Sequence, residues 1–161
     1  MNVRFRLACL ATAAVALSLC HDAGAVDPDR RLDEYAHTVW KPGDDGLYGQ
    51  PDAVAQSGDG YLWVGTSAGL FRFDGVNFLA WGQNQVGHPF DGPVLELFNS
   101  TDGSLWVSTQ YKGLRRVKGQ RVETIGRDAS AFGVMEDPAG VIWYTYYSVY
   151  GANDRELCSY K

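Results

Sequence analysis

The chain has 161 residues, of which 45% are hydrophobic, and its formal net charge is −5 at pH 7. This acidic balance, in a chain whose largest basic cluster is short, argues against nucleic acid as a partner. Beyond Ala25, no apolar run is long enough to cross a membrane.

The N-terminal segment, residues 1–25, has the pattern of a secretory signal peptide. Arg4 and Arg6 precede an apolar run at residues 7–19, and residues 23–25 read Ala-Gly-Ala, which is an A-x-A cleavage pattern. This apolar run is short for a membrane span. We therefore expect export and cleavage after Ala25.

Cysteine usage after this cleavage excludes two kinds of stabilising site. Cys9 and Cys20 leave with the signal peptide, so Cys158 is the only cysteine of the remaining chain. Neither an intramolecular disulfide nor a cysteine zinc site is expected. The alternative of a lipoprotein anchored through Cys20 is weak, because Leu19 before it is not a small residue.

Residues 26–51 are a lead-in, in which residues 35–40 are predicted as an outer strand that lacks its three partners. Residues 52–92 then form a first complete unit. Its two Asp-Gly pairs, at 59–60 and 74–75, are strong hairpin signals and predict tight type I′ turns. The unit is predicted to have four strands, at about 52–57, 61–66, 70–73 and 77–81.

The pattern of this unit recurs along the chain. The stretch at 58–75, GDGYLWVGTSAGLFRFDG, is matched by residues 100–119, and a weaker copy lies at 136–147. Trp63, Trp106 and Trp143 are in register, 43 and 37 residues apart, and repeats of about 40 residues are typical of propeller blades. The second and third units are predicted at 93–127 and 128–161, the third incomplete.

Four short antiparallel strands per unit predict an all-β fold, a partial β-propeller of about two full blades plus parts of two more. Blades pack face to face, so their middle strands are covered on both sides and tolerate runs such as YLWV. The three repeated tryptophans are expected to fill equivalent gaps between blades. We expect the chain to be the N-terminal part of a longer protein, because both ends of the pattern fall within a blade.

The motif D-G-x-L-W-V-G-T followed by G-L-x-R-x-D-G-x-x-F resembles the two-component regulator propeller repeat, and residues 34–161 carry the resemblance. Thr145 and Tyr146 depart from it, standing where Gly and Thr are expected. The repeat signature is carried by Asp59, Gly60, Trp63, Gly65, Thr66, Gly69, Asp74, Gly75, Asp102, Gly103, Trp106, Thr109, Gly113 and Trp143.

The resemblance implies a periplasmic ligand-sensing module. In that family, propellers of many repeats precede a membrane helix anchored in the inner membrane and an output domain, which is a histidine kinase, a hybrid kinase or a diguanylate cyclase. Those domains and the remaining blades would be this chain's partners. Two alternatives are a freestanding exported binding or scaffold protein that completes its propeller by assembly, and a fragment of a propeller lyase or hydrolase.

The sequence offers no constellation for catalysis, a metal or a cofactor. His37 and His88 are 51 residues apart with no ligand at metal spacing. The acidic turn at 44–46 lacks the length and terminal Glu of a calcium loop, so it is expected to be an ordinary turn. No Ser or Cys has a partner that would make it a nucleophile, and we expect no enzymatic activity from this chain.

Loops at one mouth of a propeller are the expected ligand site. They would include residues 83–91, 110–112 and 147–154. Tyr111, Lys112 and Tyr147 are the binding candidates, because phenol rings and a cation suit a saccharide or another small molecule. The cluster Lys112, Arg115, Arg116, Lys118 and Arg121 is interpreted as a charged strand that guards an edge or as a solvated rim, with binding of an anion as the alternative.

Overall fold

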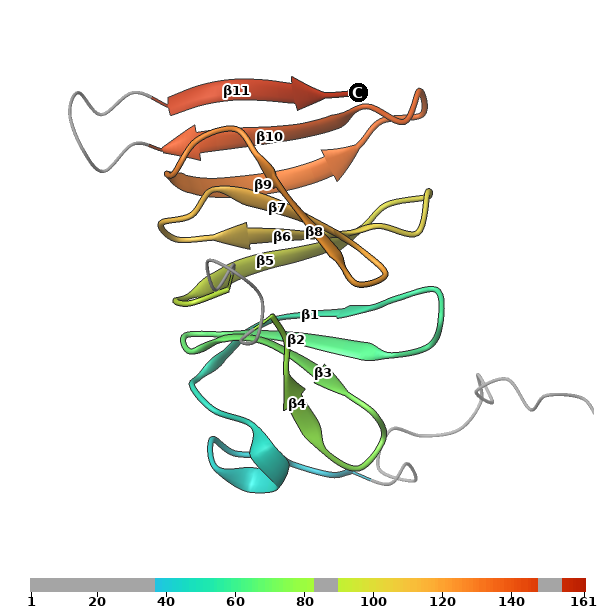
Figure 1. Ribbon diagram of the computed structural model, residues 1–161, viewed down its shortest axis with the longest axis vertical. Helices are drawn as coiled ribbons and strands as arrows, with labels where there is room; N and C mark the ends of the chain where they lie inside the picture. The colour runs from blue at the N-terminus through green and yellow to red at the C-terminus, as the bar shows by residue number, and fades with distance from the viewer. Residues whose placement is uncertain (1–36, 83–89, 148–154) are drawn as a thin grey trace, which may run out of the picture. The chain divides into compact units, whose positions relative to one another are not determined.

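The computed structural model describes residues 37–82, 90–147 and 155–161 (Figure 1). Apart from the 3-10 turn η2 (Asp44–Gly46), every element in these ranges is a β-strand. The predicted signal peptide and the first part of the outer strand predicted at 35–40 lie outside the described residues. Residues 37–40 form no strand, because no other strand pairs with them.

The first sheet is an antiparallel meander in the order β1-β2-β3-β4. Its strands are β1 (Pro51–Gln56), β2 (Leu62–Thr66), β3 (Gly69–Phe73) and β4 (Phe78–Ala80). Each strand begins and ends within one residue of its predicted position. The apolar runs between Asp-Gly pairs therefore located these strands correctly.

The second and third sheets repeat the arrangement. The second runs in the order β5-β6-β7-β8, with β5 (Val94–Asn99), β6 (Leu105–Thr109), β7 (Leu114–Lys118) and β8 (Arg121–Ile125). The third has three strands in the order β11-β10-β9, which are β9 (Ser130–Glu136), β10 (Ile142–Tyr147) and β11 (Arg155–Tyr160). The chain is therefore all-β, with antiparallel sheets that correspond to propeller blades, as predicted.

Neither Asp-Gly pair of the first sheet, at 59–60 or at 74–75, forms the predicted type I′ turn. In the first sheet, the Gly60 amide donates to the Ser57 carbonyl at 2.9 Å, and Gly60 has φ 89°. A type I′ turn needs positive φ at both central residues, but Asp45 is the only non-glycine with positive φ in the described part of the chain. Residues 57–60 therefore form a four-residue turn that ends in a glycine with left-handed backbone geometry. This loop is longer than the predicted one.

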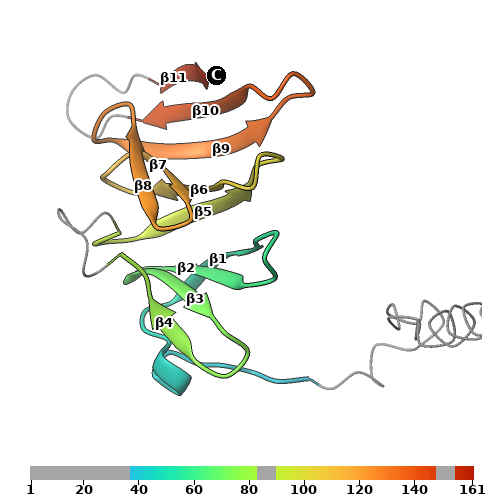
Figure 2. The same ribbon diagram turned by 45° about the vertical axis from the view of Figure 1, so that its right-hand side comes forward.

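The three sheets pack face to face in chain order (Figures 1 and 2). Trp63 of the first sheet is buried against apolar residues of the second, among them Val94, Leu105 and Val107. Trp106 of the second sheet is buried in the same way against residues of the third, including Ala131 and Tyr144. Both tryptophans fill gaps between blades as predicted, whereas Trp143 of the third sheet is only half-buried.

Small residues stand two positions after Trp63 and Trp106, where each sheet contacts the next one. A Cβ atom added to Gly65 would lie 2.5 Å from Cγ1 of Val94 in the next sheet. Ser108 occupies the equivalent position in the second sheet, and its hydroxyl donates a hydrogen bond to the carbonyl of Ala131 in the third. The small residue of the repeat thus permits the first strand of the following blade to approach.

Candidate functional site

Two of the predicted ligand-binding residues lie in one turn. Tyr111 and Lys112 are in the turn between β6 and β7, at the same edge of the stacked sheets as the β2–β3 turn and the end of β10 (Figures 1 and 2). Tyr111 is 52% exposed. The Lys112 ammonium lies 3.8 Å from the Asp91 carboxylate, so this turn presents an exposed ring beside a pair of opposite charges.

The third candidate, Tyr147, is the last residue of β10 and belongs to the next sheet. It lines a cavity of about 480 Å³ together with Phe132, Thr145, Tyr146 and Arg155. The Arg155 guanidinium carbon lies 5.8 Å from the centre of the Tyr147 ring. A cation beside a phenol ring is chemically suited to a polar organic ligand. Most of the loops predicted to surround this edge, at 83–89 with His88 and at 148–154, lie outside the described residues.

The threonine of the repeat signature closes the turns at this edge. The Thr66 hydroxyl accepts a hydrogen bond from the Ala68 amide at 3.0 Å and donates one to the Gly69 carbonyl at 3.2 Å. Thr109 makes the same pair of contacts with Lys112 and Gly113. These contacts give the signature threonines a structural role beneath the exposed turns.

Tyr146 shows why the third copy departs from the repeat. It takes the place of this threonine, is 3% exposed, and donates its hydroxyl hydrogen to the Ile125 carbonyl of the second sheet. A Cβ atom on Gly126 would lie 2.0 Å from that hydroxyl oxygen, and burial raises the pKa of Tyr146. From the sequence, Tyr146 is only a departure from the expected threonine. In the structure it forms a contact between the third and second blades.

The interpretation of the basic cluster as an edge guard or a solvated rim is wrong for Arg115. This residue belongs to β7, which pairs with β6 and β8 on its two sides, so β7 is not an edge strand that needs charged guards. Arg115 is only 6% exposed, its Nε and Nη1 atoms have no hydrogen-bond partner, and burial lowers its pKa. Aligning the repeats gives a signal for this burial, because Arg115 stands where the first unit has the buried Phe71.

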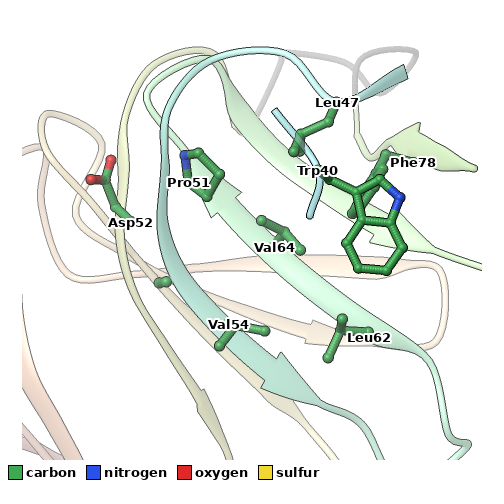
Figure 3. Close-up of a pocket in the computed structure, with 9 residues that line it drawn as sticks. Trp40, Leu47, Pro51, Asp52, Val54, Leu62, Val64 and Phe78 are labelled. Carbon is green, nitrogen blue, oxygen red and sulfur yellow. The ribbon is translucent and has the colours of Figure 1, made fainter. Parts of the chain in front are cut away.

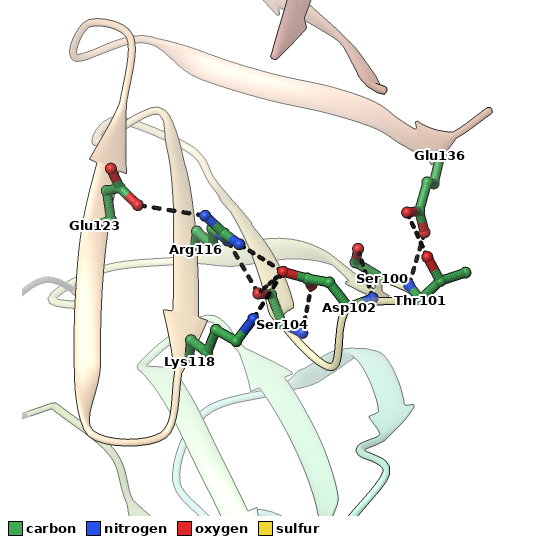
Figure 4. A network of polar contacts seen from close by, with 8 residues as sticks. All are labelled: Ser100, Thr101, Asp102, Ser104, Arg116, Lys118, Glu123 and Glu136. Atoms are coloured by element: carbon green, nitrogen blue, oxygen red, sulfur yellow. Dashed lines mark hydrogen bonds and ion pairs between the residues drawn. The ribbon is translucent and has the colours of Figure 1, made fainter. Parts of the chain in front are cut away.

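A polar network at the opposite ends of the strands surrounds Asp102 (Figure 4). The Asp102 carboxylate accepts hydrogen bonds from Arg116 Nη2 at 2.5 Å, from Lys118 Nζ at 3.0 Å and from the Ser104 amide and hydroxyl. Burial alone would raise the pKa of Asp102, but these contacts with Ser104, Lys118 and Arg116 together hold it well below its usual value. The signature aspartate therefore anchors the β6–β7 hairpin.

A lowered pKa makes this network sensitive to acid. Because Asp102 has a lower pKa in the folded chain than its ordinary 3.8, its stabilisation is present above that value and is lost as the pH falls. We expect Asp102→Asn to weaken the dependence of the unfolding free energy on pH between about pH 5 and pH 2. Urea unfolding at several pH values measures this dependence. Asp91→Asn, at a carboxylate with 78% of its side chain exposed, is the control, and equal effects of both variants would contradict the prediction.

A second cavity, of about 340 Å³, lies on the other face of the first sheet (Figure 3). Trp40 covers part of it, with its ring 5.9 Å from that of Phe78 and its Nε1 donating to Asp45 at 3.2 Å. The lining is apolar except for one carboxylate and is formed by Trp40, Leu47, Pro51, Asp52, Ala53, Val54, Leu62, Val64 and Phe78. With so few polar groups to orient a ligand, this surface is suited to packing.

The acidic stretch of the lead-in lies in a short turn. The Asp44 carboxylate accepts a hydrogen bond from the Lys41 amide at 2.7 Å, and η2 is formed by these residues. Within the described ranges, no three His, Cys, Asp or Glu side chains are grouped as metal ligands. In the same ranges, no helix has the length and apolar character needed to span a membrane.

Comparisons with known proteins give a likeness of fold. No model of a known protein family matches the sequence, and no curated protein matches it. The extracellular domain of a hybrid two component system from B. thetaiotaomicron is similar, with a TM-score of 0.58 and 17% identity over 76% of this chain. This chain spans 20% of the length of that domain.

Two structures of virginiamycin B lyase from Staphylococcus aureus also match. Their TM-scores are 0.44 and 0.46, with 17% and 18% identity over 70% of this chain and 41% of theirs. At 17% identity, the likeness to the extracellular domain of the hybrid two component system shows the fold alone. That fold is an all-β domain of the propeller type.

Proposed function

We propose that this chain is the ligand-sensing input part of a larger two-component signal-transduction sensor. The observation that carries the proposal is the D-G-x-L-W-V-G-T motif of the first sheet. It recurs in the second sheet with Ser108 in place of its second glycine, and both copies lie in equivalent β-hairpins. The likeness of fold to the extracellular domain of a hybrid two component system supports it. In this proposal the signal peptide exports the propeller to the periplasm, and the chain itself has no catalytic role.

The ligand of this sensor would bind at the edge that carries Tyr111, Lys112 and Tyr147. The exposed Tyr111 ring, the charged pair of Lys112 with Asp91 and the cavity beside Tyr147 and Arg155 suit a saccharide or another small polar molecule. Further blades, a membrane helix and a histidine kinase, hybrid kinase or diguanylate cyclase would complete the parent protein.

Sequencing of the encoding DNA for several kilobases beyond the Lys161 codon tests this proposal. We expect the reading frame to continue, or to resume after a shift, into more W-V-G-T repeats, a membrane-spanning segment and a kinase or cyclase domain. A stop codon followed by none of these regions would contradict the sensor assignment.

Exposed apolar residues favour one alternative, a freestanding exported protein that assembles with other chains. Val54 of the first sheet is 64% exposed, and Met135 and Leu157 of the third are 55% and 71% exposed. Assembly would cover such surfaces. Sedimentation and limited proteolysis of the purified chain distinguish the two functions, because an assembling protein forms a discrete, protease-resistant oligomer, whereas an isolated sensor fragment aggregates or is digested.

A further inference from the structure

A cleft of about 330 Å³ separates the first and second sheets at the ends of the strands opposite to Tyr111 and Lys112. It is lined by Ser57, Gly58, Asp59, Trp63, Arg72, Trp81, Gly103, Leu105, Val117, Gly119 and Gln120. Its volume is at the lower end of the range of small-molecule sites, which begins at about 300 Å³. The lining combines tryptophan rings with a guanidinium, a carboxylate and a hydroxyl.

Arg72 is the cation of this cleft. Its guanidinium carbon lies 4.3 Å from the centre of the Tyr61 ring and 5.1 Å from that of Trp81. Its Nε atom is buried without a hydrogen-bond partner, and so is Nε1 of Trp81. Across the described ranges, no hydrogen bond or ion pair of at most 4.0 Å ties the Arg72 guanidinium to an acceptor.

The second sheet has an arginine, Arg116, at the position equivalent to Arg72. Arg116 lies opposite Trp106 as Arg72 lies opposite Trp63. Its guanidinium is 2.5 Å from Asp102 Oδ2, 3.0 Å from Ser104 Oγ and 3.7 Å from Glu123 Oε2 (Figure 4). Two carboxylates therefore neutralise Arg116, and together with the Ser104 hydroxyl they orient it.

Two of these three acceptors are replaced around Arg72. Tyr61 stands where the second unit has Ser104, and Leu79 stands opposite Arg72 where Glu123 stands opposite Arg116. Asp59 retains the place of Asp102, but its Oδ1 accepts a hydrogen bond from Ser57. The first unit thus keeps the cation, replaces two acceptors with a ring and an aliphatic side chain, and has an open cleft beside it.

We propose that this cleft binds a small organic molecule through its carboxylate, with Arg72 as the anchor. A guanidinium offers paired donors that match the two oxygens of a carboxylate. The tryptophan rings of Trp63 and Trp81, whose centres are 5.2 Å apart, would contact the body of the ligand. Asp59 in the same lining favours a singly charged carboxylate over a doubly charged phosphate, because repulsion grows with the charge of the ligand. The site is separate from the edge proposed for sensing, and neither assignment depends on the other.

Titration of the full 161-residue chain with D-glucuronate and cyclohexanecarboxylate, followed by tryptophan fluorescence, tests this site. The neutral counterparts D-glucose and cyclohexanemethanol differ by the charged group. We expect at least one acid to bind saturably and its neutral counterpart to bind at least about tenfold more weakly, as loss of a charge-assisted contact predicts. No saturable binding of either acid to the folded chain would overturn the proposal.

Variants separate this site from general charge attraction. Arg72→Gln is expected to lower the affinity at least about tenfold, while Arg121→Gln, the same change at an exposed residue of β8, leaves it unchanged. Arg72→Lys should have an intermediate effect, and Asp59→Asn should tighten binding. If Arg72→Gln fails to fold, the last two variants decide the test. Equal losses in Arg72→Gln and Arg121→Gln, or weaker binding by Asp59→Asn, would overturn the proposal.

Discussion

Replacing Trp106 or Trp63 by alanine is expected to destabilise the chain by about 3–5 kcal/mol, the usual cost of truncating a buried aromatic side chain. Trp106 is 2% exposed and Trp63 is 6% exposed, and each packs against the following sheet. Each variant therefore removes a large buried side chain from an interface between blades. Urea unfolding monitored by circular dichroism measures the loss.

The same substitution at Trp143 is the informative comparison. Trp143 has the same place in the repeat, but it is half-buried, and its Nε1 donates a hydrogen bond to Asp137 at 3.0 Å. We expect Trp143→Ala to cost less than half as much as Trp106→Ala. If the alanine variants do not fold, the Trp→Phe series at the three positions gives the same ranking on a smaller scale.

Tyr111→Ala is the surface control for this series. Its side chain is 52% exposed, and substitutions at such positions usually change stability by less than about 0.5 kcal/mol. Similar losses for Tyr111→Ala and Trp63→Ala would show that the tryptophans do not lie between blades. The assigned register of the repeat would then be wrong.

The strands of this fold could be predicted because the information that specifies them is local. Each hairpin of the first sheet is encoded in one short stretch of sequence, as an apolar run between turn residues, and the repeat of that pattern supplied the sheets that follow. The turn type was missed because an Asp-Gly pair alone does not set the loop length. In the structure, Ser57 and Gly60 close a longer turn.

The candidate sites were harder to predict because their neighbours come from different repeats. Tyr146 meets the Ile125 carbonyl of the preceding sheet, and the cleft beside Arg72 is completed by Leu105 and Val117 of the following one. Composition and spacing within one unit do not reveal such contacts. Comparing equivalent positions between units does, as the replacement of Ser104 and Glu123 by Tyr61 and Leu79 illustrates.

The second large effect is expected at Gly69, the first residue of β3. Gly69 has φ 127°, and a Cβ atom there would lie 2.5 Å from the Phe90 carbonyl oxygen. Because that obstacle is backbone, a methyl group cannot be accommodated by rotation of a side chain. We expect Gly69→Ala to cost about 2–4 kcal/mol, as the sum of overpacking and an unfavourable positive φ.

Gly75→Ala separates these two contributions. Gly75 also has a positive φ, 103°, but no atom lies within 4 Å of a Cβ placed there. Only the backbone penalty of about 1 kcal/mol applies to it. Urea unfolding of both variants measures the difference, which reports the contact between the β2–β3 turn and the chain segment at Phe90. Equal losses of stability in the two variants would mean that the β2–β3 turn does not pack against Phe90 in solution. The first blade would then not contact the chain segment that leads into the second blade.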